Sequence, residues 1–218
     1  MKIIFSPAKS QVIRSSPLAL QNSILFPEKT KVLQKILHAL SLTELMKVLK
    51  ISEKKAKEVY MMYHDNSQKS PAISTFNGTS FKELHNEFNR KESLYMEKHL
   101  VILSALYGIL GPFDLIQAYR LDMNDRLVLH GYKNLYDFWE NTYVEFFKKE
   151  KCILNLASEE YAKLVSKKYQ GIMINVHLVN EQKGIQKIIP VHAKKQRGKL
   201  LQYCITHMIT DPQVLTKY

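Results

Sequence analysis

Short runs of consecutive apolar residues alternate with longer segments of helical spacing along this chain. Three short runs bounded by polar or turn residues predict buried strands at residues 2–5, 100–103 and 152–156. From Glu28 to Leu40 the apolar side chains recur every three or four residues, which is the spacing of one face of a helix. Strands that alternate with helices in this way are typical of an α/β domain.

Capping residues predict where further helices begin in the first half of the chain. Ser41 and Glu44 form a capping box for a helix that continues through Leu49. Ser52 can cap a third helix, so the segment 42–63 superficially resembles the helix-turn-helix of DNA-reading proteins. Because it has no glycine in its turn and no third flanking helix pattern, we do not assign that motif.

The second half of the chain predicts more helices and a hairpin. Asn134 can cap a helix whose apolar stripe is expected in the core, and Ser158 can cap a short helix. Two β-rich runs, 171–179 and 185–191, flank a turn and predict an antiparallel hairpin. Together these elements predict a mixed sheet flanked by helices, folded as a single α/β domain over residues 1–218.

The composition indicates a folded cytoplasmic protein. The chain is 45% hydrophobic and 24% charged, which are ordinary values for a globular domain. Its first apolar run is too short for a secretion signal, and no stretch approaches the roughly 18 apolar residues of a membrane span. The two cysteines lie far apart and the eight histidines show no ligand spacing. We therefore predict free thiols, no metal site and no cofactor.

The distribution of positive charge gives the strongest indication of a partner. The 32 Lys and Arg residues exceed the 20 Asp and Glu residues, for a formal charge of +12. Between Lys163 and Leu200, nine basic residues stand against the single acid Glu181. Such an excess favours encounter with nucleic acid, acidic lipid or phosphorylated ligands through long-range steering.

A basic run at the start of the last predicted helix is the sharpest of these features. That helix is expected at about residues 194–207, and Lys194, Lys195, Arg197 and Lys199 would cover a broad front at its amino end. A solvated helix start is the alternative interpretation. Cations at an amino end oppose the helix dipole, however, so an arrangement that costs local stability favours a role in binding phosphate.

Polar residues follow two of the predicted strands. Ser6 and Lys9 come after the first strand, and Asn155, Ser158 and Tyr161 come at or after the end of another. Open α/β sheets bind ligands beyond the carboxyl ends of their strands, so these residues are candidates for a crevice that takes a small phosphorylated ligand. The alternatives are a local turn at Ser6 with a solvated Lys9, and a purely capping role for Ser158.

A glycine-containing turn lies within residues 103–112. Gly108 and Gly111 are both expected to be free to adopt positive φ there. Tight turns between hydrophobic elements bring backbone amides near phosphate in helix-hairpin-helix proteins. The segment therefore offers a weak match to that element.

Arg120 adds a further candidate for anion binding. It could equally form an internal ion pair with Asp114 or Asp122. Glu159 and Glu160 begin a predicted helix, where their charges complement the dipole. Catalysis by either acid would need a second acid, a base or a metal nearby, so no catalytic residue is assigned.

Six segments spread over nearly the whole chain share their order and residue types with one known family. They are Ser6-Pro7-Ala8-Lys9, Phe76-Asn77-Gly78, residues 103–122, Leu135-Tyr136-Asp137-Phe138-Trp139, residues 155–161 and Ala193-Lys194-Lys195-Gln196-Arg197-Gly198. Together they resemble the YaaA family of peroxide-stress proteins. The resemblance implies an α/β fold particular to the family, a positively charged cleft and a helix-hairpin-helix-like element. It also implies binding of duplex or branched DNA and a role in limiting iron-driven damage under hydrogen peroxide, with no established catalytic activity.

The resemblance carries over residue by residue. The basic family positions are matched by Lys9, Arg120, Lys194, Lys195 and Arg197, and the strand-end motif by Asn155, Ser158 and Tyr161. Two departures bear on DNA binding: Gly111 stands where the family usually has Arg, and the chain stops at Tyr218 where relatives continue. We therefore predict a DNA-binding protein of the peroxide response. The alternative is an enzyme that acts on a nucleotide or nucleobase in a basic crevice.

Overall fold

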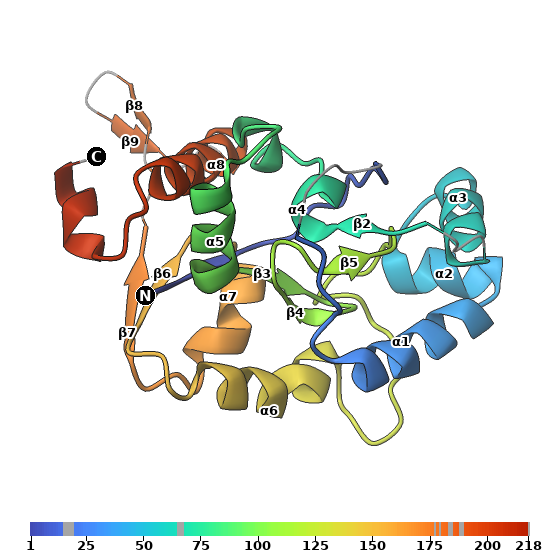
Figure 1. Ribbon diagram of the computed structural model, residues 1–218. Helices are drawn as coiled ribbons and strands as arrows, with labels where there is room; N and C mark the ends of the chain where they lie inside the picture. The colour runs from blue at the N-terminus through green and yellow to red at the C-terminus, as the bar shows by residue number, and fades with distance from the viewer. Residues whose placement is uncertain are drawn as a thin grey trace.

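A five-stranded mixed sheet lies at the centre of the computed structural model (Figure 1). The structure describes residues 1–14, 20–64, 68–176, 178, 180–182, 185–187 and 190–217. In spatial order the strands are β4 (Gly108–Leu110), β3 (Leu100–Ser104), β1 (Lys2–Phe5), β6 (Cys152–Asn155) and β7 (Ile172–Asn175). All pairs are parallel except β3 with β4, which confirms both the mixed sheet and the three strands predicted from apolar runs.

The central strand β1 is covered on both of its faces. Ile3 and Ile4 are each 0% exposed, although consecutive side chains of a strand point to opposite faces of the sheet. In Figure 1, α5 (Arg90–His99) and α8 (Pro190–Thr206) lie on one side of the sheet. On the other side lie α6 (Leu135–Phe147) and α7 (Glu159–Ser166). A strand that is buried on both faces has a continuous apolar run in its sequence, which is why this strand could be predicted.

Three further helices lie beyond β4, an edge strand of the main sheet, and several shorter elements complete the fold. Beyond that edge lie α1 (Pro27–Ala39), α2 (Leu42–Leu49) and α3 (Glu53–His64) (Figure 1). The shorter elements are β2 (Ser70–Pro71), α4 (Ala72–Thr75), η1 (Phe81–Glu83), β5 (Leu115–Ile116), β8 (Asn180–Gln182), β9 (Ile185–Lys187) and η2 (Pro212–Lys217). Within the described ranges, no helix is both long and apolar enough to cross a bilayer.

The predicted caps of α2 and α6 are confirmed. Ser41 and Glu44 form both hydrogen bonds of a capping box, and Asn134 accepts a hydrogen bond from the Asp137 amide at 3.0 Å. The stripe that follows on α6 is buried. From it, the Trp139 indole donates to the Ala105 carbonyl at 2.9 Å, and the Tyr143 hydroxyl donates to the Gly108 carbonyl at 2.7 Å. The helix thereby fixes the turn between β3 and β4.

The segment 103–112 forms a β-hairpin, and the predicted helix-hairpin-helix-like element is not confirmed. Residues 105–107 make the turn between β3 and β4. Gly108 has φ +71°, and a Cβ atom there would lie 2.5 Å from the Trp139 ring, so both its backbone conformation and its packing require glycine. Gly111 does not use this freedom, since its φ is not positive.

The predicted pairing of 171–179 with 185–191 is wrong. Residues Ile172–Asn175 instead extend the main sheet as β7, parallel to β6. This arrangement satisfies the edge of β6, which would otherwise present unpaired backbone groups. A smaller antiparallel hairpin joins β8 and β9, and residues 177, 179, 183–184 and 188–189 of the predicted runs lie outside the described residues.

Helix α8 begins at Pro190, four residues before the predicted start. Proline suits the first position of a helix because its missing N–H would have no intrahelical partner there. Lys194 is therefore the fifth residue of the helix, where the dipole has little effect on a charge. The prediction that the basic run opposes the dipole at a helix end is wrong. What indicates a function for this run is that its lysine side chains are exposed.

Asp114 is a buried carboxyl group in the loop between β4 and β5. It is 3% exposed, and its Oδ2 atom accepts a hydrogen bond from the Gly111 amide at 2.9 Å. Burial raises the pKa of Asp114 to about 6, and the hydrogen bond from Gly111 opposes this rise only in part. The charge of Glu97 adds to the increase.

Replacement of Asp114 by Asn is expected to stabilise the protein above pH 6. The carboxyl group has an ordinary pKa of 3.8 and a folded-state pKa of about 6. Below both values it is neutral in both states. As the pH rises between them, the unfolded chain releases its proton first, so stability falls by up to about 3 kcal/mol. An amide keeps an acceptor for the Gly111 N–H and removes this loss.

Urea unfolding at about pH 4 and about pH 7.5 measures the difference. The exposed Glu145→Gln variant serves as the control, since it changes the same charge without a burial effect. If Asp114→Asn increased the free energy of unfolding equally at both pH values, the raised pKa of Asp114 would be contradicted.

Candidate functional site

Parallel pairing brings the carboxyl ends of β1 and β6 together. Ile4 lies opposite Asn155, and the Leu156 amide continues the pairing by donating to the Ile4 carbonyl at 3.0 Å. Directly after β1, the Ser6 hydroxyl accepts a hydrogen bond from the Ser158 amide at 2.8 Å and donates to the Ser158 hydroxyl at 3.1 Å. The structure thus places these two predicted crevice residues in direct contact.

Ser158 occupies the N-cap position of α7, but its side chain does not cap the helix. No hydrogen bond joins its hydroxyl to an amide of the first turn. The hydroxyl accepts from Ser6 instead. A hydrogen bond with Ser6, 152 positions away in the sequence, takes the place of the local capping hydrogen bond. No sequence pattern indicates this change of partner.

Asn155 orders the loop after β6. Its amide nitrogen donates to the Asn175 side chain at the end of β7 at 2.7 Å, and its oxygen accepts from the Ala157 amide at 3.0 Å. These bonds engage both ends of the side chain. Asn155 therefore holds the strand end in place at the edge of the site.

Lys9 and Tyr161 meet on a carboxylate that the sequence offered only as a partner for Arg120. The Lys9 ammonium lies 2.8 Å from Asp122 Oδ2, and the Tyr161 hydroxyl donates to Asp122 Oδ1 at 3.4 Å. The side chain of Asp122 is 16% exposed, whereas that of Lys9 is 62% exposed. Asp122 is therefore a crevice residue that the sequence analysis did not identify. Its pairing with Lys9 depends on the fold and has no signal in the sequence.

Two further carboxyl groups surround this ion pair. The Asp125 side chain accepts from the Asp122 amide at 2.7 Å, and Glu160 Oε1 accepts from the Asn124 amide at 3.2 Å. Burial raises the pKa of both Asp125 and Glu160, and the charge of Asp122 contributes to each rise. The strand end therefore carries three carboxyl groups beside Lys9, although the sequence indicated a basic crevice. Across the described ranges, no three His, Cys, Asp or Glu side chains group so that they could hold a metal ion.

Arg120 forms neither of the two ion pairs considered for it. Asp122 pairs with Lys9, and Asp114 accepts from the Gly111 amide. The Arg120 carbonyl accepts a hydrogen bond from the Tyr63 hydroxyl, which fixes its backbone. Its guanidinium forms no ion pair within 4 Å of a described carboxylate, although its charge acts on Asp125 and favours the ionised form of that group.

The basic run lies on the second and third turns of α8. Lys194, Lys195 and Lys199 are exposed, whereas Arg197 is half-buried and burial lowers its pKa. Lys195 lies 3.8 Å from Glu83, and Lys194 and Lys199 make no ion pair with a described residue. Three exposed lysines therefore lie here, and among the described residues only Glu83 forms an ion pair with one of them.

One connecting segment, residues 76–83, contacts the end of β1 on one side. The Asn77 amide donates to the Ser10 carbonyl at 2.8 Å. Gly78 lies directly against Ala8, because a Cβ atom on this glycine would be 2.7 Å from the Ala8 Cβ. The loop that carries Lys9 is therefore anchored on this segment.

The same segment contacts α8 on its other side. The Ser80 hydroxyl donates to the Lys194 carbonyl at 2.8 Å. A Cβ atom on Gly198 would lie 2.1 Å from the Ser80 carbonyl oxygen, so only glycine lets the helix approach this closely. The strand end and the basic run are thus two neighbours of the 76–83 segment.

Replacement of Lys9 by Gln is expected to raise the pKa of Glu160 further. The charge of Lys9 favours the ionised form of Glu160, and the substitution also leaves Asp122 without its cation. Carbon-13 NMR titration of the side-chain carboxyl groups measures the effect. Lys195→Gln is the control, since Lys195 lies beside Glu83 on another part of the surface. An unchanged Glu160 titration, or an equal shift in the control, would disprove the coupling.

Comparison with known proteins gives matches over the full length of the chain. The family model described as "Peroxide stress protein YaaA" matches residues 1–218. A UPF0246 protein of Fusobacterium nucleatum is 36% identical, over 100% of this chain and 90% of that protein. UPF0246 proteins of Francisella tularensis and Desulfotalea psychrophila are 34% and 32% identical, again over 100% of this chain and over 92% and 90% of theirs.

Proposed function

Because the chain belongs to the family of the peroxide stress protein YaaA, we propose that it binds duplex or branched DNA in the response to hydrogen peroxide and limits iron-driven damage. The family's name supports the link to peroxide stress. The observation that carries DNA binding is the set of exposed lysines on α8, Lys194, Lys195 and Lys199, which have one carboxylate nearby.

The geometry of α8 suits a nucleic-acid backbone. Lys194 and Lys199 are five residues apart, which corresponds to roughly 7.5 Å along a helix axis. Phosphates follow one another at about 3.4 Å per strand along the axis of a duplex, so three flexible ammonium groups can reach two or three of them. Such contacts are made to phosphate and do not discriminate between bases, so binding is largely independent of the DNA sequence.

Phosphate binding also offers a physical route to protection from iron. DNA holds a condensed layer of counterions, and a protein that neutralises phosphates releases them. Ferrous ions held in that layer leave with the others. Radical formation by iron and peroxide then takes place further from the DNA strand.

The α8 lysines should account for a large part of the salt dependence of DNA binding. Each phosphate contact contributes about 0.9 to the slope of log K against log salt. The Lys194→Ala, Lys195→Ala, Lys199→Ala triple variant is therefore expected to lower the magnitude of the slope by up to about 2.7. Filter binding to a duplex at several salt concentrations measures it.

A matched control removes the same charge elsewhere. Lys55, Lys57 and Lys148 are exposed, and each lies within 2.8 Å of a glutamate on its own helix or helix end. Their replacement by Ala should leave the slope nearly unchanged. An unaltered slope in the α8 variant, or an equal loss in the control, would remove α8 from the interface.

The carboxyl groups at the strand end favour a second candidate function. Raised pKa values at Asp125 and Glu160 beside the Lys9–Asp122 pair are typical of general acids and bases. An enzyme that acts on a nucleotide or nucleobase would place its reacting group there, close to Ser6 and Ser158. The same carboxylates repel a phosphate backbone, so this candidate uses a different part of the surface from α8.

Glu160→Gln is expected to abolish turnover of a nucleotide substrate under this second function, because the amide cannot transfer a proton. A panel of nucleotides incubated with the protein and separated by liquid chromatography gives the readout. The neighbouring Glu159 is exposed, and its replacement by Gln is the control. Absence of turnover by the unaltered protein, or full activity of Glu160→Gln, would argue against an enzyme.

A further inference from the structure

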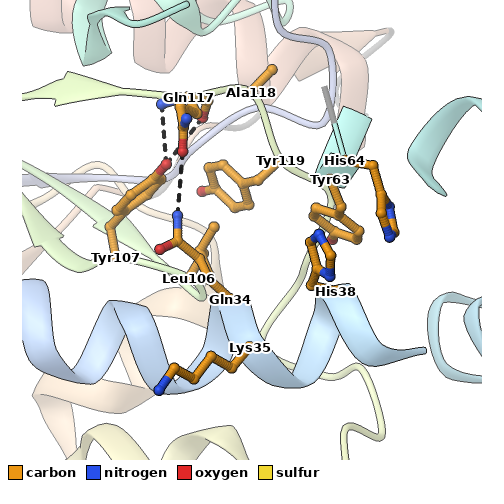
Figure 2. A pocket seen from close by; sticks show the side chains of 10 residues that line it. All are labelled: Gln34, Lys35, His38, Tyr63, His64, Leu106, Tyr107, Gln117, Ala118 and Tyr119. Atoms are coloured by element: carbon orange, nitrogen blue, oxygen red, sulfur yellow. Dashed lines mark hydrogen bonds between the residues drawn. The ribbon is translucent and has the colours of Figure 1, made fainter. Parts of the chain in front are cut away.

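A pocket of about 330 Å³ lies between α1, α3 and the chain around the hairpin and β5 (Figure 2). None of the residues that line it belongs to the strand-end site or to α8. The residues that line it are Gln34, Lys35, His38, Tyr63, His64, Leu106, Tyr107, Gln117, Ala118 and Tyr119. They come from four separate segments of the chain, so no sequence motif predicts the pocket.

Buried tyrosines form the floor of the pocket. Tyr119 lies between Tyr107 and Tyr63 in Figure 2, and all three side chains are buried. Their hydroxyls are engaged elsewhere. Tyr63 donates to the Arg120 carbonyl, Tyr107 to the Gln117 carbonyl at 3.2 Å, and Tyr119 pairs with Ser104 at 2.9 Å. The tyrosines therefore present ring surface to an occupant.

Two exposed histidines form the rim. The rings of Tyr60 and His64 stack with centroids 4.0 Å apart, and His38 extends the column at 3.9 Å from His64. His64 Nδ1 lies 2.8 Å from the Tyr60 carbonyl, so that nitrogen carries the proton and Nε2 is an acceptor in the neutral ring. Among the described residues, no further aromatic ring stacks on the other face of His38, which is an exposed residue.

Gln34 gives the pocket a hydrogen-bonding edge. Its side chain points from α1 toward Gln117 (Figure 2), and its nitrogen donates to Gln117 Oε1 at a long 3.4 Å. The Gln34 oxygen and its second N–H have no partner within the described part of the chain. An amide with one free acceptor and one free donor matches the N6 and N7 atoms of adenine.

Two cations, Lys35 and Arg120, lie near this pocket. None of the described residues that line it is Asp or Glu, and Lys35 extends along the outside of α1 (Figure 2). Arg120, whose carbonyl accepts from the Tyr63 hydroxyl, lies next to the lining, and its charge acts on Asp125 without forming an ion pair within 4 Å. An anion attached to an aromatic ligand would be attracted by these cations, against the charge of Asp125, which also reaches Tyr63.

We infer that this pocket binds a nucleobase that carries a phosphate, with adenine preferred. The base stacks on His38 over the tyrosine floor, Gln34 reads its edge, and the phosphate faces Arg120 and Lys35. The volume lies near the lower end of the range for small-molecule sites and suits one nucleotide. The nucleotide is either free or an unpaired residue of DNA, and only the second source rests on the proposed function.

Binding of AMP, with ribose 5-phosphate as the comparison, tests the inference by titration calorimetry. AMP should bind at least about tenfold more tightly, since stacking needs the base. Gln34→Leu and His38→Ala should each weaken AMP by about tenfold. Lys31→Ala, an exposed change on the same helix, should have no effect. Equal affinities for AMP and ribose 5-phosphate, or unchanged binding by both pocket variants, would overturn the inference.

A second arm uses a duplex with one unpaired 2-aminopurine, whose fluorescence reports on stacking. If the source is DNA, this duplex binds more tightly than a fully paired one, and Gln34→Leu removes the difference. If the source is a free nucleotide, AMP binds and the two duplexes are equal. Loss of all duplex binding with AMP binding intact would contradict the proposed function alone. Duplex binding without AMP binding or bulge preference would contradict this inference alone.

Discussion

The position of every functional group follows from the parallel pairing of β1 on both of its sides. Its hydrogen bonds to β3 and β6 leave it no edge, and Ile3 and Ile4 leave it no exposed face. The chain beyond Phe5 leaves the sheet between the ends of β3 and β6. Ser6 meets Ser158 there at 2.8 Å, and the loop that carries Lys9 begins from this fixed point.

The surface that results is divided by charge. Asp122, Asp125 and Glu160 gather at the strand end, while three exposed lysines lie on α8. The 76–83 segment holds both parts, through contacts as close as those of Gly78 with Ala8 and Gly198 with Ser80. In the function that we propose, a nucleic-acid backbone is attracted to α8 and repelled by the carboxyl groups. The proposal therefore gives the two parts different tasks, phosphate binding for the helix and small-molecule chemistry for the strand end.

The sequence predicted what is decided locally. Apolar runs marked β1, β3 and β6, and side-chain caps marked α2 and α6, because these signals lie within a few residues. It did not predict pairings that depend on the whole fold. The partner of β7, the exchange of the Ser158 hydroxyl from cap to Ser6, and the pairing of Lys9 with Asp122 join residues up to 152 positions apart. The nucleobase pocket was missed for the same reason, since four segments form it.

Lysine acetylation footprinting, read by mass spectrometry with and without duplex DNA, tests the central claim most directly. Each exposed ammonium reports whether phosphate covers it, independently of the affinity of any variant. The account predicts protection of Lys194, Lys195 and Lys199 in the complex, with Lys55 and Lys57 as reactive as in the free protein. Full reactivity of the three α8 lysines under conditions where the DNA is bound would contradict it.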